Sequence, residues 1–326
     1  MTRIMIAGTG SFLPERVVTN DELAERYPET SDEWIFSHTG ISSRHIASPD
    51  ETPSGIGLIA ARRALEMAGV SPKELGFILV STATPDYATV PQVSCLIQRE
   101  LGAMSAASFD ITAACCGFVY NLEIAKGFYS NRHFRKPILV VATEMMSRRV
   151  NWNDYKSCVL FGDGAGAAVL LPSDTESGIV DTVMKTDGTG AELLKIEGGA
   201  RSEESTHDPN ANILQMSGHK VYTFAIKVLP EIVKELLDRN GLAVNDIDKI
   251  VPHQANYRII HSAAVRLGFT EDMFYINVKN VANTASASIP IALDEMNRGG
   301  LLHRGDRIIT VGFGAGLSYG GNYMIW

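Results

Sequence analysis

The strongest constraint on this chain is that the same order of strands and helices is predicted twice. Apolar residues recur at strand or helix spacing from residue 56 to residue 171, and the same alternation returns from residue 249 to residue 326. Each half has the βαβ pattern of a parallel-rich sheet covered by helices. We therefore expect an internally duplicated α/β sandwich, with a seam near residues 172–178 and no linker.

The seam divides the chain into residues 1–172 and residues 173–326, which we expect to be two similar halves. Asn20 and Ser31 are the expected N-caps of the first two helices, because short polar side chains accept hydrogen bonds from free backbone N–H groups. Strands are expected at 4–7, 77–81, 108–111, 138–143, 167–171, 249–251, 274–277, 307–311 and 322–326. Helices are expected at 21–27, 32–40, 56–67, 91–101, 116–129, 256–267 and 288–297.

Composition limits the classes of partner. With 326 residues, 45% of them hydrophobic, the chain can bury a large core, and its net charge of −8 disfavours binding to nucleic acid or an anionic membrane. The first apolar run ends at glycines and Pro14, which is too short for a signal peptide, and no run reaches the about 20 residues that span a bilayer. The four cysteines lack CxxC spacing. We expect reduced thiols in the cytoplasm, without a disulfide framework or a metal site.

Cys115 stands where the strand 108–111 passes into the helix 116–129. A thiol in the first turn of a helix lies at the positive end of the helix dipole, which favours the thiolate. The neighbouring residues are small, so backbone and substrate can approach the sulfur: Thr112, Ala113, Ala114 and Gly117. Cys115 is therefore a candidate nucleophile. The alternative is that Cys115 and Cys116 are both ordinary buried residues, and for Cys116 we favour that interpretation.

Two polar residues of the second half are expected near Cys115. Asn283 stands at the corresponding passage from the third element into its helix, so pseudo-symmetry brings it to the centre of the sandwich. His253 follows the strand 249–251, at the end of a strand where open α/β sheets bind ligands. A lone histidine or asparagine is usually a satisfied structural hydrogen bond. Their matching positions in a duplicated fold favour a shared site instead.

Three glycine-containing motifs suggest other functions and are set aside. The pair at Gly8 and Gly10 lacks the third glycine of a dinucleotide site, and Pro14 stands where its helix begins. The GDGAG run around Asp163 lacks the lysine of a phosphate-binding loop. The GLSYG run would make Ser318 a hydrolase nucleophile, but no helix, acid or histidine follows it.

Six runs along the chain together resemble β-ketoacyl-acyl-carrier-protein synthase III of the thiolase superfamily. They are TSDEWIFSHTGISSRHIA at Thr30, ITAACCGF at Ile111, LFGDGAGAAVL at Leu160, PHQAN at Pro252, NTASASIPIAL at Asn283 and GFGAGLSYGG at Gly312. The resemblance covers essentially the whole chain. It implies a thiolase-like α/β/α/β/α layered sandwich, with the nucleophile in the N-terminal half and its histidine and asparagine in the C-terminal half.

The activity that this resemblance implies is a decarboxylative Claisen condensation. Cys115 would hold an acyl group as a thioester, and malonyl-acyl-carrier protein would lose carbon dioxide and attack it to give a β-ketoacyl thioester. Neutral His253 and Asn283 would donate hydrogen bonds to the enolate. The backbone N–H groups of Cys115 and Ala315 would form the oxyanion hole. No cofactor is expected beyond coenzyme A or carrier-protein phosphopantetheine, which carry the substrates.

The expected donor site departs from the family pattern. His38 stands where the family usually has an arginine after the tryptophan, Trp34, and Tyr155 replaces the arginine that would stack on the adenine of coenzyme A. Asn256 is also expected to contact the donor. Because each lost charge-assisted contact is worth about 1.5–3 kcal/mol, we expect weak binding of coenzyme A and delivery of the primer by a carrier protein.

The resemblance also implies partners. Arg258 and Arg266 on the helix 256–267 are expected to dock the acidic carrier protein, although both can also be ordinary solvated residues. A homodimer is expected through the segment 90–111, in which Cys95, Leu96 and Ile97 would offer apolar surface to the second copy. The alternative is that these three residues belong to a helix buried within one chain. The length of the primer depends on packing around Val90, Met216 and the loop 198–213.

Two other functions remain open. One is a specialised-metabolite acyltransferase or ketosynthase of the same fold, which would use a different donor or acceptor. The other is a non-catalytic partner subunit of the thiolase fold. Such a subunit would be expected to lack Cys115, His253 or Asn283, and this chain has all three.

Overall fold

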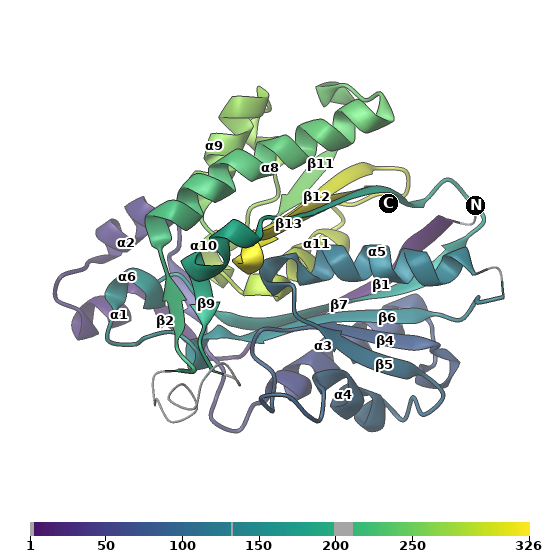
Figure 1. The fold of residues 1–326 in the computed structure, drawn as a ribbon, viewed down its shortest axis with the longest axis horizontal. Coiled ribbons are helices and arrows are strands. Elements are labelled where there is room, and N and C mark those ends of the chain that lie inside the picture. The colour runs from purple at the N-terminus through teal and green to yellow at the C-terminus, as the bar shows by residue number, and fades with distance from the viewer. Residues whose placement is uncertain (1–2, 132, 199–210) are drawn as a thin grey trace.

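The chain folds into five alternating layers of helix and sheet. The structure is a computed structural model that describes residues 3–131, 133–198 and 211–326. In Figure 1, α8 (Gly218–Asn240) and α9 (Tyr257–Leu267) form the top layer, and α3 (Pro53–Ala68) and α4 (Val93–Leu101) form the bottom layer. Two sheets lie inside them, with α5 (Gly117–Ser130) and α11 (Ser288–Arg298) between the sheets. The predicted α/β/α/β/α sandwich is therefore confirmed.

The two sheets have corresponding strand orders, and the first sheet has one strand more than the second. The first runs β5 (Ala107–Ile111), β4 (Phe77–Ser81), β6 (Ile138–Met145), β7 (Asp163–Ser173), β1 (Arg3–Phe12), and the second runs β11 (Lys249–Pro252), β12 (Arg307–Gly314), β13 (Ser318–Ile325), β8 (Gly178–Thr186). The pairs β4 with β6 and β11 with β12 are parallel, and the neighbours from there towards β1 or β8 are antiparallel. In the first sheet β5 also pairs with β4 in parallel. Phe274 makes a parallel bridge to Ile250, in the place that β5 takes beside β4. The internal duplication is thus visible in the pairing itself.

The chain passes from the first sheet to the second between Ser173, the end of β7, and Gly178, the start of β8. This connection lies close to the expected seam. The division into residues 1–172 and 173–326 as separate units stays a prediction. The smaller elements gather at one end of the sandwich, on the left in Figure 1. They are the strands β2 (Val17–Thr19), β3 (Ser43–His45), β9 (Leu194–Ile196) and β10 (Leu214–Met216) and the helices α1 (Asn20–Arg26), α2 (Asp32–Thr39), α6 (Tyr155–Cys158) and α10 (Val278–Val281).

Most predicted elements are confirmed, and two details are wrong. Ser31 caps α2 by accepting from the Trp34 N–H at 3.0 Å. Asn20 is not the cap of α1, because Thr19 accepts from the Glu22 N–H at 3.2 Å and Asn20 is already helical. The expected strand 274–277 is reduced to the single bridge at Phe274. The chain turns there into α10.

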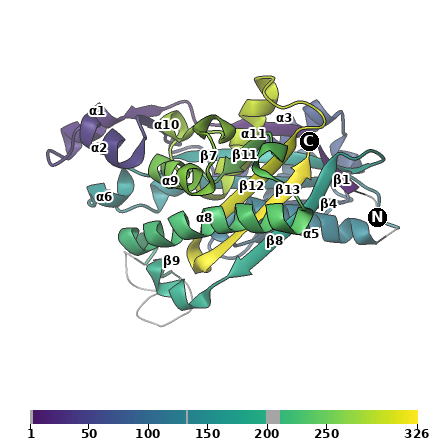
Figure 2. The same ribbon diagram turned by 90° about the horizontal axis from the view of Figure 1, so that it is seen from above.

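The largest hydrophobic cluster fills the space between the two sheets. Figure 2 shows the sandwich from above, with α8 running across the second sheet. Phe118 and Leu122 of α5 and Ile289 and Ile291 of α11 are fully buried in this cluster. Each such side chain contributes about 1.5–3 kcal/mol when it leaves water. The two central helices are therefore held from both sides.

The glycines of β1 allow close packing against α3. A Cβ atom at Gly8 would lie 2.5 Å from the Ala64 carbonyl oxygen, and one at Gly10 would lie 2.2 Å from the Ala60 carbonyl oxygen. Real Cβ atoms do not approach backbone so closely. Gly8 and Gly10 are therefore explained by the close packing of β1 on α3, without a dinucleotide site.

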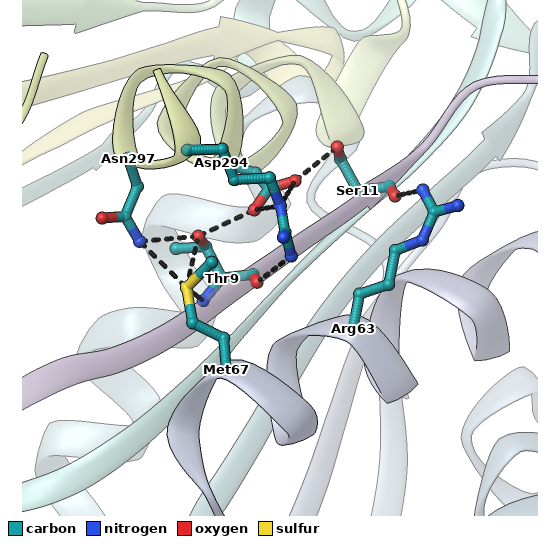
Figure 3. A network of polar contacts seen from close by, with 7 residues as sticks. Thr9, Ser11, Arg63, Met67, Asp294 and Asn297 are labelled. Carbon is teal, nitrogen blue, oxygen red and sulfur yellow. Dashed lines mark hydrogen bonds and ion pairs between the residues drawn. The ribbon is translucent and has the colours of Figure 1, made fainter. Parts of the chain in front are cut away.

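A buried polar network joins the two halves of the chain. Figure 3 shows Asp294 of α11 beside Thr9 and Ser11 of β1. The Asp294 carboxylate, only 2% exposed, accepts from the Thr9 hydroxyl at 2.8 Å and the Ser11 hydroxyl at 2.6 Å. Arg298 pairs with the same carboxylate at 2.9 Å, and Asn297 donates to the Thr9 hydroxyl at 3.0 Å. Thr9 and Ser11 of the first half and Arg298 of the second half thus share one carboxylate.

Replacing Asp294 by Ala should lower the free energy of unfolding by about 3 kcal/mol, because it leaves buried hydroxyls and a guanidinium without their shared acceptor. The matched control is Glu22→Gln, which breaks the exposed ion pair with Arg16 and should cost less than about 1 kcal/mol. Urea denaturation followed by circular dichroism measures both. Equal losses for the two variants would contradict this account of how the halves are joined.

Candidate active site

The three candidate catalytic residues line one cavity. This cavity, of about 530 Å³, lies at the end of the sandwich where α2, α8 and α9 approach the nucleophile turn. Cys115, His253 and Asn283 all contribute to its wall, so the structure brings together what the sequence placed in two halves. Most other lining residues are apolar. They include Met146, Val159, Leu194, Ile196, Leu214, Met216, Phe224, Ile259 and Phe313.

Cys115 lies in a tight turn, Ala114–Cys116, between β5 and α5. Ala114 has a φ of 45°, in the left-handed region. The second half repeats the arrangement: Ala285 has a φ of 46° at the start of the turn Ala285–Ala287, which leads into α11. Such conformations cost a non-glycine residue about 1–3 kcal/mol and concentrate at functional sites. The duplicated fold therefore supplies two copies of a strained turn, one with the thiol and one beside Asn283.

The resting Cys115 is a thiol, contrary to the expectation of a thiolate. Burial raises the pKa of Cys115 to about 12, and the nearby Glu144 carboxylate adds to the rise. The backbone N–H of Cys115 itself acts in the opposite direction and is outweighed. Cys116 is fully buried and its thiol donates to the Ser318 carbonyl at 3.3 Å, as expected of a core residue.

His253 is buried and neutral. His253 follows β11, and its backbone N–H donates to the Val311 carbonyl at 2.7 Å. Its ring contacts the Phe313 ring edge-on, with the ring centroids 5.3 Å apart. Burial lowers the pKa of His253 to about 3. Its Nδ1 lies 2.7 Å from the Ser288 hydroxyl, whose oxygen also accepts from the Gln254 N–H at 3.3 Å. When the Ser288 hydroxyl donates to Nδ1, the proton of the imidazole lies on Nε2.

Asn283 is held so that its amide nitrogen remains available. Its Oδ1 accepts from the Ala285 N–H at 2.8 Å, and its backbone is bonded on both sides, to the Leu160 carbonyl at 3.0 Å and from the Gly162 N–H at 3.1 Å. The residue is 7% exposed and lines the cavity. With its oxygen occupied, Asn283 offers N–H donors.

The end of β12 lies directly against the nucleophile. A Cβ atom at Gly314 would lie 3.0 Å from the Cys115 nitrogen and 3.2 Å from its Sγ, so only glycine fits without displacement. Cys115 and Ala315 each lie in the first turn of a short helical segment, where backbone N–H groups have no helical partner. Both residues line the cavity, as an oxyanion hole requires.

The cavity mouth carries the expected aromatic residues in a closed arrangement. Trp34 stacks on His38 with ring centroids 4.5 Å apart, and Tyr155 meets Trp34 edge-on at 5.6 Å and 71°. An adenine can therefore lie between Trp34 and Tyr155 only if one ring turns away. Asn256 joins α9 to α2 by donating to the His38 carbonyl at 3.1 Å, and its Oδ1 caps α9. Trp34, His38, Asn256 and the cationic Lys156 line the mouth.

The residues expected to meet partners are only partly on the surface. Arg258 and Arg266 are exposed on α9, and Arg266 is tied to α8 through the Ile226 carbonyl at 2.9 Å. Val90 is 76% exposed and Cys95 is exposed, but Ile97 is fully buried. The expectation that Ile97 offers surface was wrong, because α4 turns it into the core with Ile56 and Val93 of the first half. Much of the loop 198–213 lies outside the described residues.

Sequence reasoning missed three polar residues behind the cavity wall: Glu144, Ser286 and Ser288. Glu144 is fully buried on β6, Ser286 donates to it at 2.6 Å, and Ser288 orients His253. The available signal for Glu144 was a lone carboxylate inside the apolar strand Ile138–Met145. The serines follow Asn283 in the same run and had no separate signal.

Comparison with known proteins finds similar proteins that match this chain over nearly its whole length. Two family models match, 3-oxoacyl-[acyl-carrier-protein] synthase III over residues 109–188 and the C-terminal part of that synthase over residues 237–326. The β-ketoacyl-[acyl-carrier-protein] synthase III of Caldanaerobacter subterraneus subsp. tengcongensis is 44% identical, over 98% of this chain and 97% of that protein. That of Methylococcus capsulatus is 45% identical, over 97% and 96%.

The chain belongs to the β-ketoacyl-acyl-carrier-protein synthase III family. Solved structures agree: the 3-oxoacyl-[acyl-carrier-protein] synthase III of Aquifex aeolicus has a TM-score of 0.92 at 38% identity, covering 99% of this chain and 100% of that one. The priming β-ketosynthase of the R1128 polyketide pathway also has a TM-score of 0.92, at 40% identity, covering 99% and 96%.

The family membership confirms the function that the sequence motifs implied. The chain is a condensing acyltransferase, a β-ketoacyl synthase of the kind that initiates fatty acid synthesis. In the part of the chain that the structure describes, none of the helices has the length and apolar character of a membrane span.

Proposed function

We propose that Cys115 accepts the acyl group in the first of two steps. The Cys115 sulfur attacks the carbonyl carbon of an acyl thioester, the bond from that carbon to the carrier sulfur breaks, and the thiol proton leaves with the carrier thiol. The backbone N–H groups of Cys115 and Ala315 stabilise the oxyanion that forms between these events. The raised pKa of the thiol means that the attacking sulfur loses its proton only as the substrate carbonyl arrives.

In the second step a malonyl thioester on acyl carrier protein loses carbon dioxide. The bond to its carboxylate breaks, and the electron pair forms an enolate whose oxygen accepts from His253 Nε2–H and Asn283 Nδ2–H. The enolate carbon then attacks the Cys115 thioester, which releases the β-ketoacyl product and a Cys115 thiolate. Burial favours the return of a proton to that thiolate, since the thiol is the stable form of Cys115.

The observation that carries this proposal is the convergence of a partly buried thiol, a buried neutral imidazole and an asparagine with its oxygen occupied on one apolar cavity. Neutral donors suit an enolate, because they stabilise its charge without transferring a proton to it irreversibly. A pKa of about 3 keeps His253 uncharged throughout the physiological range. The apolar wall excludes water and strengthens both hydrogen bonds.

The carrier of the primer is proposed to be acyl carrier protein rather than coenzyme A alone. The contact of Trp34 with Tyr155 at 5.6 Å leaves no slot for an adenine between them, which supports weak binding of coenzyme A. His38, Asn256 and Lys156 line the mouth and offer polar contacts to a phosphopantetheine arm. Arg258 and Arg266 are proposed to dock the acidic carrier, supported by their exposure on α9 beside this mouth.

A cytoplasmic homodimer is also proposed. The four cysteines are all free thiols, as expected in a reducing compartment. Three large apolar side chains are exposed in one segment of the first half: Tyr87 is 52% exposed, Val90 76% and Met104 72%. The same segment leads to β5, the edge strand of the first sheet, whose outer side has no strand partner among the described residues. A second copy that covers this surface would also protect the edge.

Mixing the enzyme with acyl donors should add one acyl mass to the wild-type chain and none to Cys115→Ala. Cys116→Ala serves as the matched control and should still gain the mass, because the Cys116 thiol points to Ser318 in the core. Intact-mass spectrometry with the same acyl group on coenzyme A and on carrier protein also compares the donors. Acylation of Cys115→Ala would overturn the assignment of the nucleophile. Better acylation from coenzyme A, or an unchanged rate for Arg258→Glu with the carrier protein, would overturn the corresponding part of the donor proposal.

Light scattering at micromolar concentration should give about twice the chain mass of 35.4 kDa. Val90→Glu should shift the protein towards monomer, because it places a charge in the proposed interface. Val265→Glu is the control, since Val265 is 67% exposed on α9, far along the chain from this segment. A wild-type monomer, or equal weakening by both substitutions, would count against the proposed interface.

A further inference from the structure

Glu144 is a fully buried carboxylate for which the two chemical steps give no role. It lies near the end of β6, which is buried along its whole length. Its oxygens accept from the Ala83 N–H at 3.1 and 3.2 Å, the Thr84 hydroxyl at 2.8 Å and the Ser286 hydroxyl at 2.6 Å. All three partners are uncharged. A buried carboxylate without a cation is costly, so its presence calls for a function.

The partners of Glu144 belong to two of the segments that build the active site, and the third segment packs beside them. Ala83 and Thr84 follow β4 directly, and Ala83 lines the catalytic cavity. Ser286 lies in the strained turn that follows Asn283. The nucleophile turn packs on the end of β4, because a Cβ atom at Gly117, directly after this turn, would lie 2.4 Å from the Cβ of Ser81, the last residue of β4. One carboxylate therefore ties the Asn283 turn to the strand end on which the Cys115 turn rests.

Cys115 is the titratable group that responds to this carboxylate. The segments packed against Glu144 present hydroxyls and N–H groups, from the loop after β4 and from the Asn283 turn, together with the thiol of the Cys115 turn. The negative charge of Glu144 raises the pKa of Cys115 in addition to burial. Burial in turn raises the pKa of Glu144 to about 7, with the hydrogen bonds from Ser286 and Thr84 acting against that rise.

We propose that Glu144 is a positioning residue of the condensing site: its hydrogen bonds hold the Asn283 turn in place, and its negative charge adds to burial in keeping Cys115 protonated until a substrate arrives. The inference rests on the proposed role of Cys115 as the acyl-accepting residue. It adds a device that couples the reactivity of the nucleophile to the protonation of a second buried group.

Glu144→Gln tests the charge with little change of shape. The Ser286 hydroxyl has a second acceptor, the Ser81 carbonyl at 3.3 Å, so it can turn and accept from the new amide. The readout is the rate of alkylation of Cys115 by iodoacetamide as a function of pH, followed by mass spectrometry of the peptide that contains Cys115. Iodoacetamide reacts with the thiolate, so the rate reports the ionised fraction.

In the wild-type enzyme the logarithm of the rate should rise with pH, with a flatter segment beginning near pH 7 as Glu144 ionises and suppresses the thiolate. Glu144→Gln should give an unbroken rise and, above pH 7, alkylation about tenfold faster, since a like charge close by typically shifts a pKa by about one unit or more. Asp163→Asn is the matched control. Asp163 is also a fully buried carboxylate at a strand end, and it accepts from Ala47 and Ser147 rather than from the active-site segments.

Ser286→Ala keeps the test open if Glu144→Gln does not fold. Removing a donor to the carboxylate raises the pKa of Glu144 further, so the flat segment should move to higher pH. A Glu144→Gln profile equal to that of the wild type, or a Ser286→Ala profile with its flat segment unmoved, overturns the inference. The acyl mass on Cys115 is measured separately, so a failure of the nucleophile assignment is distinguishable from a failure of the Glu144 inference.

Discussion

The site depends on one constraint: its polar groups lie between apolar layers, beside the two strained turns at Ala114 and Ala285. The turns at Ala114 and Ala285 occupy the same place in the two halves, and each leads into a central helix that is buried on both sides. Groups in this position lose contact with water, so each one must find an internal partner or stay neutral. The chemistry of the site follows from that constraint.

Burial shifts the pKa of each titratable group of the site before any substrate binds. It raises the pKa of the Cys115 thiol, lowers that of His253 and raises that of Glu144. The thiol and the imidazole are therefore uncharged at neutral pH, unlike the thiolate and imidazolium pair of many cysteine enzymes. A neutral imidazole suits a reaction in which charge appears only on the substrate, first as a tetrahedral oxyanion and then as an enolate.

The sequence predicted the fold well, and the three residues that it singled out, Cys115, His253 and Asn283, line one cavity, because both results depend on local pattern. The alternation of strands and helices, the cap at Ser31 and the junction at Cys115 are all local signals. It did not predict β8 or the long helix α8, in which Pro230 interrupts the helical pattern. The expectation of a Cys115 thiolate was wrong, because the sequence shows that Cys115 lies at a helix start but does not show how far burial raises the pKa of its thiol. Ile97 failed for the same reason, since a helical residue's burial depends on its neighbours in space.

The central claim is the division of labour between Cys115, which holds the acyl group, and the pair His253 and Asn283, which stabilises the enolate. The most direct test follows two products in each variant: the acyl mass on Cys115 and the carbon dioxide released from malonyl carrier protein. His253→Ala and Asn283→Ala should each slow the release of carbon dioxide by about 100-fold while the acyl mass still appears, because each variant removes one donor to the enolate. Variants that lose the acyl mass but release carbon dioxide at the wild-type rate would contradict the account.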